Sequence, residues 1–343
     1  MSDYKSDEEQ QQQMKKIFIC ADVLLGAFGF LFPLEIGLNI ALSSYRFNAI
    51  VDVHFKSRKW LLGSMEICRA TDGNGAEIVN AHSREGLPIS QGPLPDKVIG
   101  FKSIVISYVD QTVIEFLQLI RPFFNSSGAN VWIDNCDQSR SWEIIRQEIW
   151  PLITDNIRGL RLEPSVLYRL RQFSPAILRN CATLRSIYSL GLFPEFPAED
   201  NAAASSRQAL AKWLLTPCGD GLPKMLHCDF YLGGIDELIE SFNDASESAN
   251  FIIKIWKDGR RFVPFELKNN WTREQLSFRR LNNKWLLVRC PIGRDEDEWA
   301  KWEKEAIEWE MGRQSNCIVI TFEDIDIGDG MHAANEGQNE PNE

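Results

Sequence analysis

The chain has 343 residues, of which 44% are hydrophobic and 11% aromatic, as in an ordinary globular protein with a substantial core. Its formal net charge of −11 at pH 7 argues against nonspecific binding to nucleic acid or to anionic lipid. The eight cysteines are scattered and form no Cys-x-x-Cys pair, which is typical of a reducing compartment rather than of a disulfide framework.

The N-terminal part of the chain combines a polar tail with a strongly apolar run. Residues 1–14 hold almost no apolar side chain, so we expect them to be a disordered tail. The run Ile17–Leu42 is apolar on more than one side, so more than one of its faces must be buried. Asp22 and Glu35 interrupt it, and its charge-free part, Val23–Leu34, has 12 residues where a membrane span needs about 20. The pattern therefore argues against a membrane span, and a cleaved secretion signal is kept as an alternative.

As a folded segment, 15–57 is predicted to form three short helices. The first covers Val23–Leu31, with an acid at its start. Pro33 ends this helix and suits the first turn of the next one, Leu34–Leu42. Two serines then cap a third helix over Tyr45–Phe55.

The spacing of residues within these helices carries a resemblance. The residues in step with a known pattern are Asp22, Val23, Leu24, Leu25, Phe28, Leu31, Pro33, Leu42, Ser44, Arg46 and Phe47. In this respect the segment resembles an F-box, although Ile19-Cys20 stands where the pattern has Leu-Pro. The resemblance implies a surface that binds a Skp-type adaptor, with Val23, Leu24, Phe28 and Leu31 as apolar anchors. Its expected members are Ile19, Cys20, Asp22, Val23, Leu24, Phe28, Leu31, Pro33, Leu42, Arg46 and Phe47.

Residues 58–97 are predicted to be a linker made of a hairpin and a loop. Trp60–Arg69 and Ala76–Val79 flank the turn signal Asp72-Gly73-Asn74-Gly75, and a proline-rich stretch follows.

The longest part of the chain, 98–325, shows a repeating pattern. Short apolar strands begin near Ile104, Val131, Leu160, Leu184, Met225 and Phe251, mostly 24 to 29 residues apart. Helical stretches follow most of them: Thr112–Phe123, Ser141–Leu152, Pro164–Phe173, Gln208–Leu215 and Ile235–Phe242. A strand-then-helix period of this length indicates a leucine-rich-repeat-like solenoid, which we expect to be the target-recognition region. A doubly wound α/β domain is the alternative.

The C-terminal part changes character after the last repeat. The runs FVPFEL, LSFRRL and WLLVRC predict antiparallel hairpins. An acidic helix over Asp295–Arg313 places Trp299, Trp302, Ala306 and Trp309 on one face, which predicts either a lid on the end of the core or an exposed aromatic site. A strand over Ile318–Phe322 and a disordered tail over 326–343 complete the chain. The fold class is thus α/β (α+β overall): a three-helix F-box, then an irregular repeat-like α/β solenoid with a C-terminal hairpin and a helix cap.

No pattern for catalysis, metal binding or cofactor binding emerges. His54, His82, His227 and His332 do not cluster with cysteines at zinc-ligand spacing. His227 and Cys228 are neighbours in a predicted strand, so their side chains point to opposite faces and cannot form a nucleophile–base pair. We therefore expect no catalytic, metal or cofactor site.

Over most of its length the chain resembles a large family of nematode F-box proteins. The strings that carry this resemblance are DVLLGAFGFL, LPDKVIGFK, SWEIIRQEIWPLI, FSPAILRNCATLRSI, FPEFPAEDNAAASSRQALAKWL, GDGLPKML, PFELKNNWT and KWLLVRCPI. The resemblance implies a non-catalytic, cytoplasmic or nuclear subunit of a cullin-RING ubiquitin ligase, which binds a Skp-type adaptor and through it a cullin, and recruits a protein target. The alternatives are an interaction scaffold with a degenerate F-box and a secreted interaction protein.

Overall fold

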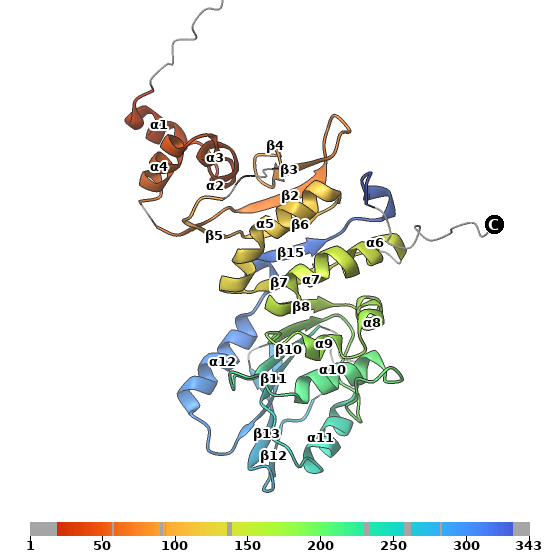
Figure 1. The fold of residues 1–343 in the computed structure, drawn as a ribbon. Coiled ribbons are helices and arrows are strands. Elements are labelled where there is room, and N and C mark those ends of the chain that lie inside the picture. The colour runs from red at the N-terminus through yellow and green to blue at the C-terminus, as the bar shows by residue number, and fades with distance from the viewer. Residues whose placement is uncertain are drawn as a thin grey trace, which may run out of the picture.

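One large sheet organises the protein. The computed structural model describes residues 19–56, 58–89, 92, 94–135, 139–229, 233–256, 262–281 and 283–331. These residues form a mixed α/β architecture around a sheet of thirteen strands, with a separate pair formed by β1 (Trp60–Leu61) and β5 (Val98–Gly100) (Figure 1). The expected tail 1–14 and residues 332–343 lie outside the described residues. Residues 326–331, expected to be part of the C-terminal tail, are instead packed, because Ile327 is buried and bridges Val109.

The strand order in the sheet is β12-β13-β14-β11-β10-β9-β8-β7-β15-β6-β2-β3-β4. The eight strands from β11 to β2 are all parallel, and antiparallel strands extend the sheet at both ends. Within the parallel part, β7 to β11 are neighbours in the order in which the chain forms them. The bounds are β2 (Ser64–Arg69), β3 (Ala76–Asn80), β4 (Gly86–Pro88), β6 (Ser103–Ile106), β7 (Ala129–Ile133), β8 (Ile157–Leu162), β9 (Ser186–Ser189), β10 (Lys224–Cys228), β11 (Phe251–Trp256), β12 (Phe265–Asn269), β13 (Glu274–Leu281), β14 (Lys284–Pro291) and β15 (Cys317–Ile320).

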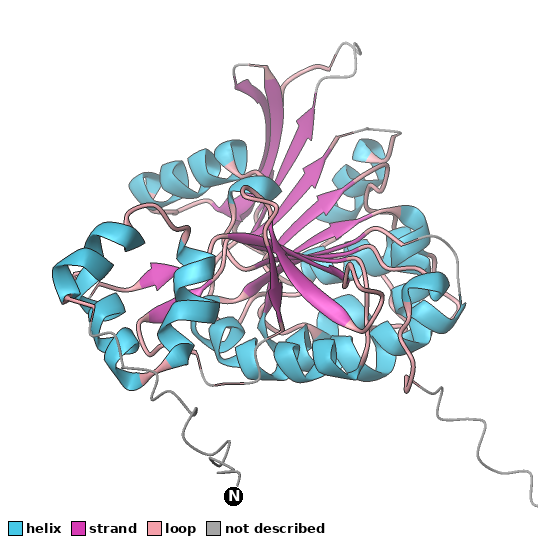
Figure 2. Ribbon diagram, turned by 90° about the horizontal axis from the view of Figure 1, so that it is seen from above, coloured by secondary structure: helices cyan, strands magenta, loops and turns pink. Residues whose placement is uncertain are grey.

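The helices cover the two faces of the sheet unequally. A row of helices packs on one side of the sheet, and a single long helix lies on the other side (Figure 2). The row comprises α5 (Gln111–Ser127), α6 (Ser139–Ile144), η3 (Ile145–Ile149), α7 (Trp150–Ile153), η4 (Thr154–Asn156), α8 (Pro164–Phe173), α9 (Ile177–Asn180), α10 (Ser206–Leu215) and α11 (Ile235–Asn243). The long helix is α12 (Glu296–Glu308), and two short turns, η5 (Met311–Arg313) and η6 (Asp324–Asp326), follow it. We call the side that carries α12 the open face, because α12 covers only part of it.

The N-terminal segment forms a compact helical unit at one end of the molecule (Figure 1). Its elements are α1 (Ala21–Phe28), α2 (Pro33–Glu35), η2 (Ile36–Ile40), α3 (Ala41–Ser43) and α4 (Tyr45–His54), of which α2, η2 and α3 form one continuous helix with a π turn. This helix packs closely on the chain that leads into the sheet. A Cβ atom at Gly37 would lie 2.6 Å from the Leu62 side chain and 2.8 Å from the Trp60 ring, so glycine permits the close approach. The helical unit is thereby fixed to the sheet region.

Most of the predicted helices and strands are present, with small shifts at their ends. The helix expected at Pro164–Phe173 has these bounds, and the strand expected from Leu184 begins two residues later, at Ser186. The hairpin expected within a linker is instead part of the main sheet, because β2 pairs with β6. The acidic helix ends at Glu308, so Trp309 lies beyond it, and α12 packs on a face of the sheet instead of covering its end.

Strand β15 connects the two parts of the sheet. It lies between β6 and β7 and pairs in parallel with both. Just before it, the buried Asn316 has a φ of 51°, and its side-chain oxygen accepts a hydrogen bond from the Phe101 amide at 3.1 Å. Its amide nitrogen donates to the carbonyl oxygens of Gly128 and Phe123, at 3.2 and 3.4 Å. One side chain therefore ties the approach to β15 to the segments that lead into β6 and β7.

We expect Asn316→Ala to lower the free energy of unfolding by about 3 kcal/mol, because it leaves the buried Phe101 N–H and Gly128 carbonyl without their partner and places alanine at positive φ. Urea unfolding of the full chain measures this loss. Asn39→Ala is the matched control, because Asn39 is an exposed helical residue whose side chain has no hydrogen bond within the described chain. Its effect should stay within about 0.5 kcal/mol, and equal losses in the two variants would contradict the role given to Asn316.

Candidate functional site

The residues expected to bind an adaptor lie on the N-terminal helical unit, but they differ in exposure. Exposed side chains are Ile19, Cys20, Asp22, Val23, Leu31 and Arg46. Half-buried ones are Pro33, Leu42 and Phe47. The remaining two, Leu24 and Phe28, are buried, with 9% and 2% of their surface exposed.

Leu24 and Phe28 cannot serve as contact anchors in this structure, which corrects the expectation for these two residues. Both belong to the hydrophobic core, and the Phe28 ring meets the His54 ring edge-on at a centroid distance of 5.7 Å. They lie one helical turn apart on the side of α1 that faces α4. Val23, which lies outside this packed side of α1, is 63% exposed.

Sequence reasoning missed the most exposed aromatic residues of the helical unit. Phe30 is 89% exposed, Tyr45 is 90% exposed, and Phe32 is also accessible. Together with Ile19, Val23 and Leu31 they form a set that we call the N-terminal apolar surface. The one-turn spacing of Leu24 and Phe28 indicates that they share one side of α1, but it does not distinguish a side that faces the core from one that faces a partner.

Two polar side chains of the helical unit, one in the pattern and one outside it, have structural roles. The Arg46 guanidinium on α4 donates a hydrogen bond to the Ile19 carbonyl and so holds the start of α1. Glu35 is buried, and its carboxylate accepts hydrogen bonds from the Phe32 amide at 3.0 Å, the Ser83 hydroxyl at 3.0 Å and the Asn80 side chain at 3.3 Å. Glu35 therefore fastens the second helix of the unit to the β3–β4 turn.

A second candidate region lies on the open face of the sheet, where Trp309 covers the middle strands. The Trp309 ring stacks on the His227 ring at a centroid distance of 4.6 Å and lies 6.3 Å from the Tyr188 ring. Two lysines hold the end of α12 above the sheet. Lys254 Nζ donates to the Trp309 carbonyl at 3.2 Å, and Lys284 Nζ donates to the Ile307 carbonyl at 2.9 Å.

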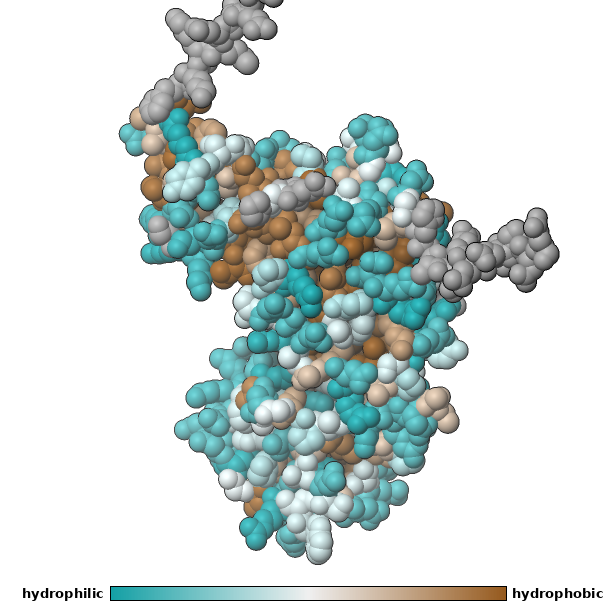
Figure 3. Space-filling view, in the orientation of Figure 1, coloured by the Kyte–Doolittle hydropathy of each residue, from teal (hydrophilic) through white to brown (hydrophobic). Residues whose placement is uncertain are grey.

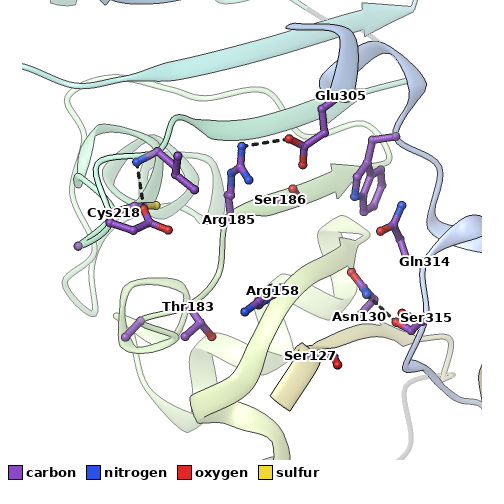
Figure 4. Close-up of a pocket in the computed structure, with 15 residues that line it drawn as sticks. Ser127, Asn130, Arg158, Thr183, Arg185, Ser186, Cys218, Glu305, Gln314 and Ser315 are labelled. Carbon is purple, nitrogen blue, oxygen red and sulfur yellow. Dashed lines mark hydrogen bonds and ion pairs between the residues drawn. The ribbon is translucent and has the colours of Figure 1, made fainter. Parts of the chain in front are cut away.

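A cavity of about 520 Å³ lies on one side of Trp309, near the N-terminal ends of β7, β8 and β9 (Figure 4). Arg158 and Arg185 reach it from the sheet, and Glu305 of α12 pairs with Arg185 at 3.3 Å. Cys218 contributes a thiol to the lining beside the hydroxyl groups of serine and threonine residues, and burial raises the pKa of this thiol. The thiol is therefore protonated at neutral pH, and the lining contains no histidine that would activate it.

A second cavity, of about 340 Å³, lies on the other side of Trp309. Its lining combines the basic side chains of Arg161, Lys254 and Lys284 with the rings of Tyr188, Trp256 and Trp309. Asp229 and Glu310 also line this cavity, so basic, aromatic and acidic groups meet in it.

The histidines and cysteines complete the list of candidate groups. Within the described residues, no group of three or more His, Cys, Asp or Glu side chains could hold a metal ion. His227 lies on the open face beneath Trp309, whereas Cys228 belongs to the core on the helix-covered face, as their adjacent positions in β10 predicted. His332 lies outside the described residues.

Comparisons with protein-family models, with curated proteins and with solved structures find no match to this chain. Among the helices of the described part of the chain, none is both long and apolar enough to cross a bilayer. The function must therefore be argued from the two regions described above.

The buried His227 predicts a pH dependence of stability. Burial, with the charges of Lys254 and Lys284, holds the pKa of His227 well below its usual value of 6.5. Below pH 6.5 the unfolded chain binds a proton that the folded chain does not bind, so the free energy of unfolding falls as the pH decreases. Well below pH 6.5, this one histidine lowers the free energy of unfolding by about 1.4 kcal/mol for each unit by which the pH decreases.

His227→Phe keeps a ring beneath Trp309 and removes the titrating group. The difference between wild type and His227→Phe in urea unfolding, measured from pH 8 to pH 5, should be flat above pH 6.5 and should change steadily below it. Parallel pH profiles for the two proteins would show that His227 titrates normally and is not enclosed.

Proposed function

We propose that the protein is an F-box-type recruiting subunit of a cullin-RING ubiquitin ligase. The N-terminal helical unit would bind a Skp-type adaptor, and the α/β region would hold a protein target. The transfer chemistry would belong to other subunits, and this protein would raise the effective concentration of target lysines near the loaded conjugating enzyme.

The observation that carries this proposal is the N-terminal apolar surface. Large apolar side chains that are exposed together mark protein contact sites, and aromatic residues dominate the binding energy of such sites. Figure 3 shows hydrophobic side chains gathered on the N-terminal unit and the adjoining part of the sheet region, whereas the far end of the molecule is mostly hydrophilic. Val23 and Phe30 lie on this surface without a large role in the core.

The way in which the helical unit is held supports the same function. Gly37 packs against Trp60 and Leu62, and Glu35 binds the β3–β4 turn, so the unit is anchored on one side. The opposite side is thus presented in a fixed orientation. A rigid link between an adaptor-binding unit and a target-binding region is what a recruiting subunit needs, because it fixes the distance over which ubiquitin is transferred.

The order of the strands supports a repeat-like target region. Strands β7 to β11 are parallel neighbours in chain order, and the connecting helices lie on the same face. This is the arrangement expected of a solenoid, in which each strand–helix unit packs on the preceding one. A doubly wound domain would instead place its helices on both faces and reverse its strand order at one point.

A second candidate is an interaction scaffold whose F-box-like segment only completes the fold. The positions of Leu24, Phe28 and Arg46 favour it, because these residues of the pattern make contacts within the chain. The two candidates differ in what the exposed residues do, since the scaffold makes no use of Val23 and Phe30.

We expect the full chain to bind a purified Skp-type adaptor in a pull-down, and Val23→Asp and Phe30→Asp each to weaken that binding at least tenfold. The new carboxylate would be buried without a partner at the contact, which costs several kcal/mol. Because both side chains are exposed in the free protein, the midpoints of urea unfolding should stay close to the wild-type value. Substitutions of Leu24 or Phe28 are unsuitable, because they would remove core contacts.

Val263→Asp is the matched control. Val263 is 77% exposed and precedes β12, far from the N-terminal unit in the chain and at the opposite end of the sheet. This variant should bind the adaptor as the wild type does. If the wild-type chain does not bind the adaptor, the ligase proposal fails and the scaffold remains.

A further inference from the structure

The cavity of about 340 Å³ beside Trp309 is lined by three basic side chains, Arg161, Lys254 and Lys284. Lys254 and Lys284 each donate to a backbone carbonyl, which leaves further N–H groups on each ammonium. Arg161 has no hydrogen bond or ion pair with any other described residue, and its Nε is buried without a partner. Among the described residues, no carboxylate forms an ion pair with any of these three basic side chains.

Two aromatic rings hold the Arg161 guanidinium in place. It lies 3.8 Å from the centroid of the Trp132 ring and 5.6 Å from that of the Tyr188 ring. Stacking on rings leaves the N–H groups at the edge of the guanidinium available for a planar acceptor. Trp132 Nε1 is a second buried donor without a partner on the same face of the sheet. Unpaired buried donors are costly, so this part of the sheet is suited to an incoming acceptor.

The acids in the lining are already engaged. Asp229 accepts a hydrogen bond from the Tyr188 hydroxyl. Glu310 forms an ion pair with Arg313 at 2.9 Å. The lining thus holds three basic and two acidic side chains, which gives it a net charge of +1 in a chain whose net charge is −11. An acidic ligand would complement this positively charged cavity in an otherwise acidic protein.

The distance between the basic side chains indicates whether the ligand carries one doubly charged group or two separate negative charges. The register places Arg161 level with Lys254, three strand spacings away across β8, β9, β10 and β11. That separation is about 14 Å at the backbone. A single phosphate is too small to engage both ends, whereas an extended peptide covers the distance with about four residues. Each end suits one carboxylate, and the Arg161 fork matches carboxylate geometry.

We propose that this cavity binds an extended acidic peptide of a partner protein, with two carboxylate side chains about four residues apart. One carboxylate contacts Arg161, the other lies beside Lys254 and Lys284, and the intervening residues pack on the rings of Tyr188 and Trp309. The peptide crosses the strands on the part of the open face that α12 leaves free. This inference deepens the proposed function by naming the chemistry of the recruited segment, and its test involves no adaptor.

The test uses the immobilised full chain and two pools of labelled nonapeptides. One pool has glutamate fixed at its third and seventh positions, and the other has glutamine there, with all other positions varied. The wild type should retain the glutamate pool at least tenfold more strongly than the glutamine pool. Arg161→Gln should lower retention of the glutamate pool about tenfold, as expected for the loss of one charge-assisted hydrogen-bonded contact.

Arg158→Gln is the matched control, because Arg158 lies three residues earlier on the same strand, is exposed and lines the other cavity. It removes the same charge and should retain the glutamate pool as the wild type does. Lys284→Gln, at the far end of the cavity, is a second variant that should also weaken retention. Urea unfolding of each variant shows that the fold is kept.

Three outcomes would overturn the inference. These are equal retention of the two pools by the wild type, equal losses in Arg158→Gln and Arg161→Gln, and tenfold preference for a third pool with phosphoserine at the fixed positions. Equal retention of the two pools would show that the site does not select acidic peptides. Equal losses in the two arginine variants would show that retention depends only on the net charge of the protein. A preference for phosphoserine would show that the site binds a phosphate instead of a carboxylate. A negative adaptor pull-down with positive peptide retention would remove the ligase function and leave the peptide site in place.

Discussion

The continuity of the sheet depends on one short strand near the C-terminal end of the described chain. β15 takes up the hydrogen bonds of β6 on one side and of β7 on the other, so the N-terminal strands and strands β7 to β11 share a single core. Asn316 sets the entry into β15 by bonding to the segments before both neighbours. The helical unit, the row of helices and the open face all take their positions from this arrangement, because each packs on strands that β15 joins.

Local signals in the sequence predicted much of the fold, and long-range pairing explains the rest. The proline and the apolar spacing of Pro164–Phe173 define a helix without any reference to distant residues. The strand near Ile318 was also predictable, but its place between β6 and β7 was not, because its partners lie about 190 to 215 residues away. The sequence also placed Trp309 on α12, since the helical period continues through it, whereas the chain leaves the helix one residue earlier to place the ring on the sheet.

The candidate sites show the same limit. The helices of the N-terminal unit could be predicted, and several members of its outer surface with them, but which side of α1 faces inward could not. Leu24 and Phe28 are apolar whether they meet a partner or α4, and only the packing distinguishes these cases. The cavity beside Trp309 left no trace in the sequence, because its basic groups come from β8, β11 and β14 and become neighbours only through the register of the strands.

The place of β15 also bears on how the protein is made. During synthesis β6 and β7 emerge early, yet the strand that separates them emerges some 180 residues after β7. Until then each of them has an unpaired edge, and exposed edges of apolar strands are templates for association with other chains. If β6 paired directly with β7, β15 could no longer insert between them. A nascent chain of this protein is therefore expected to depend on chaperones that shield strand edges for most of the time that its synthesis takes.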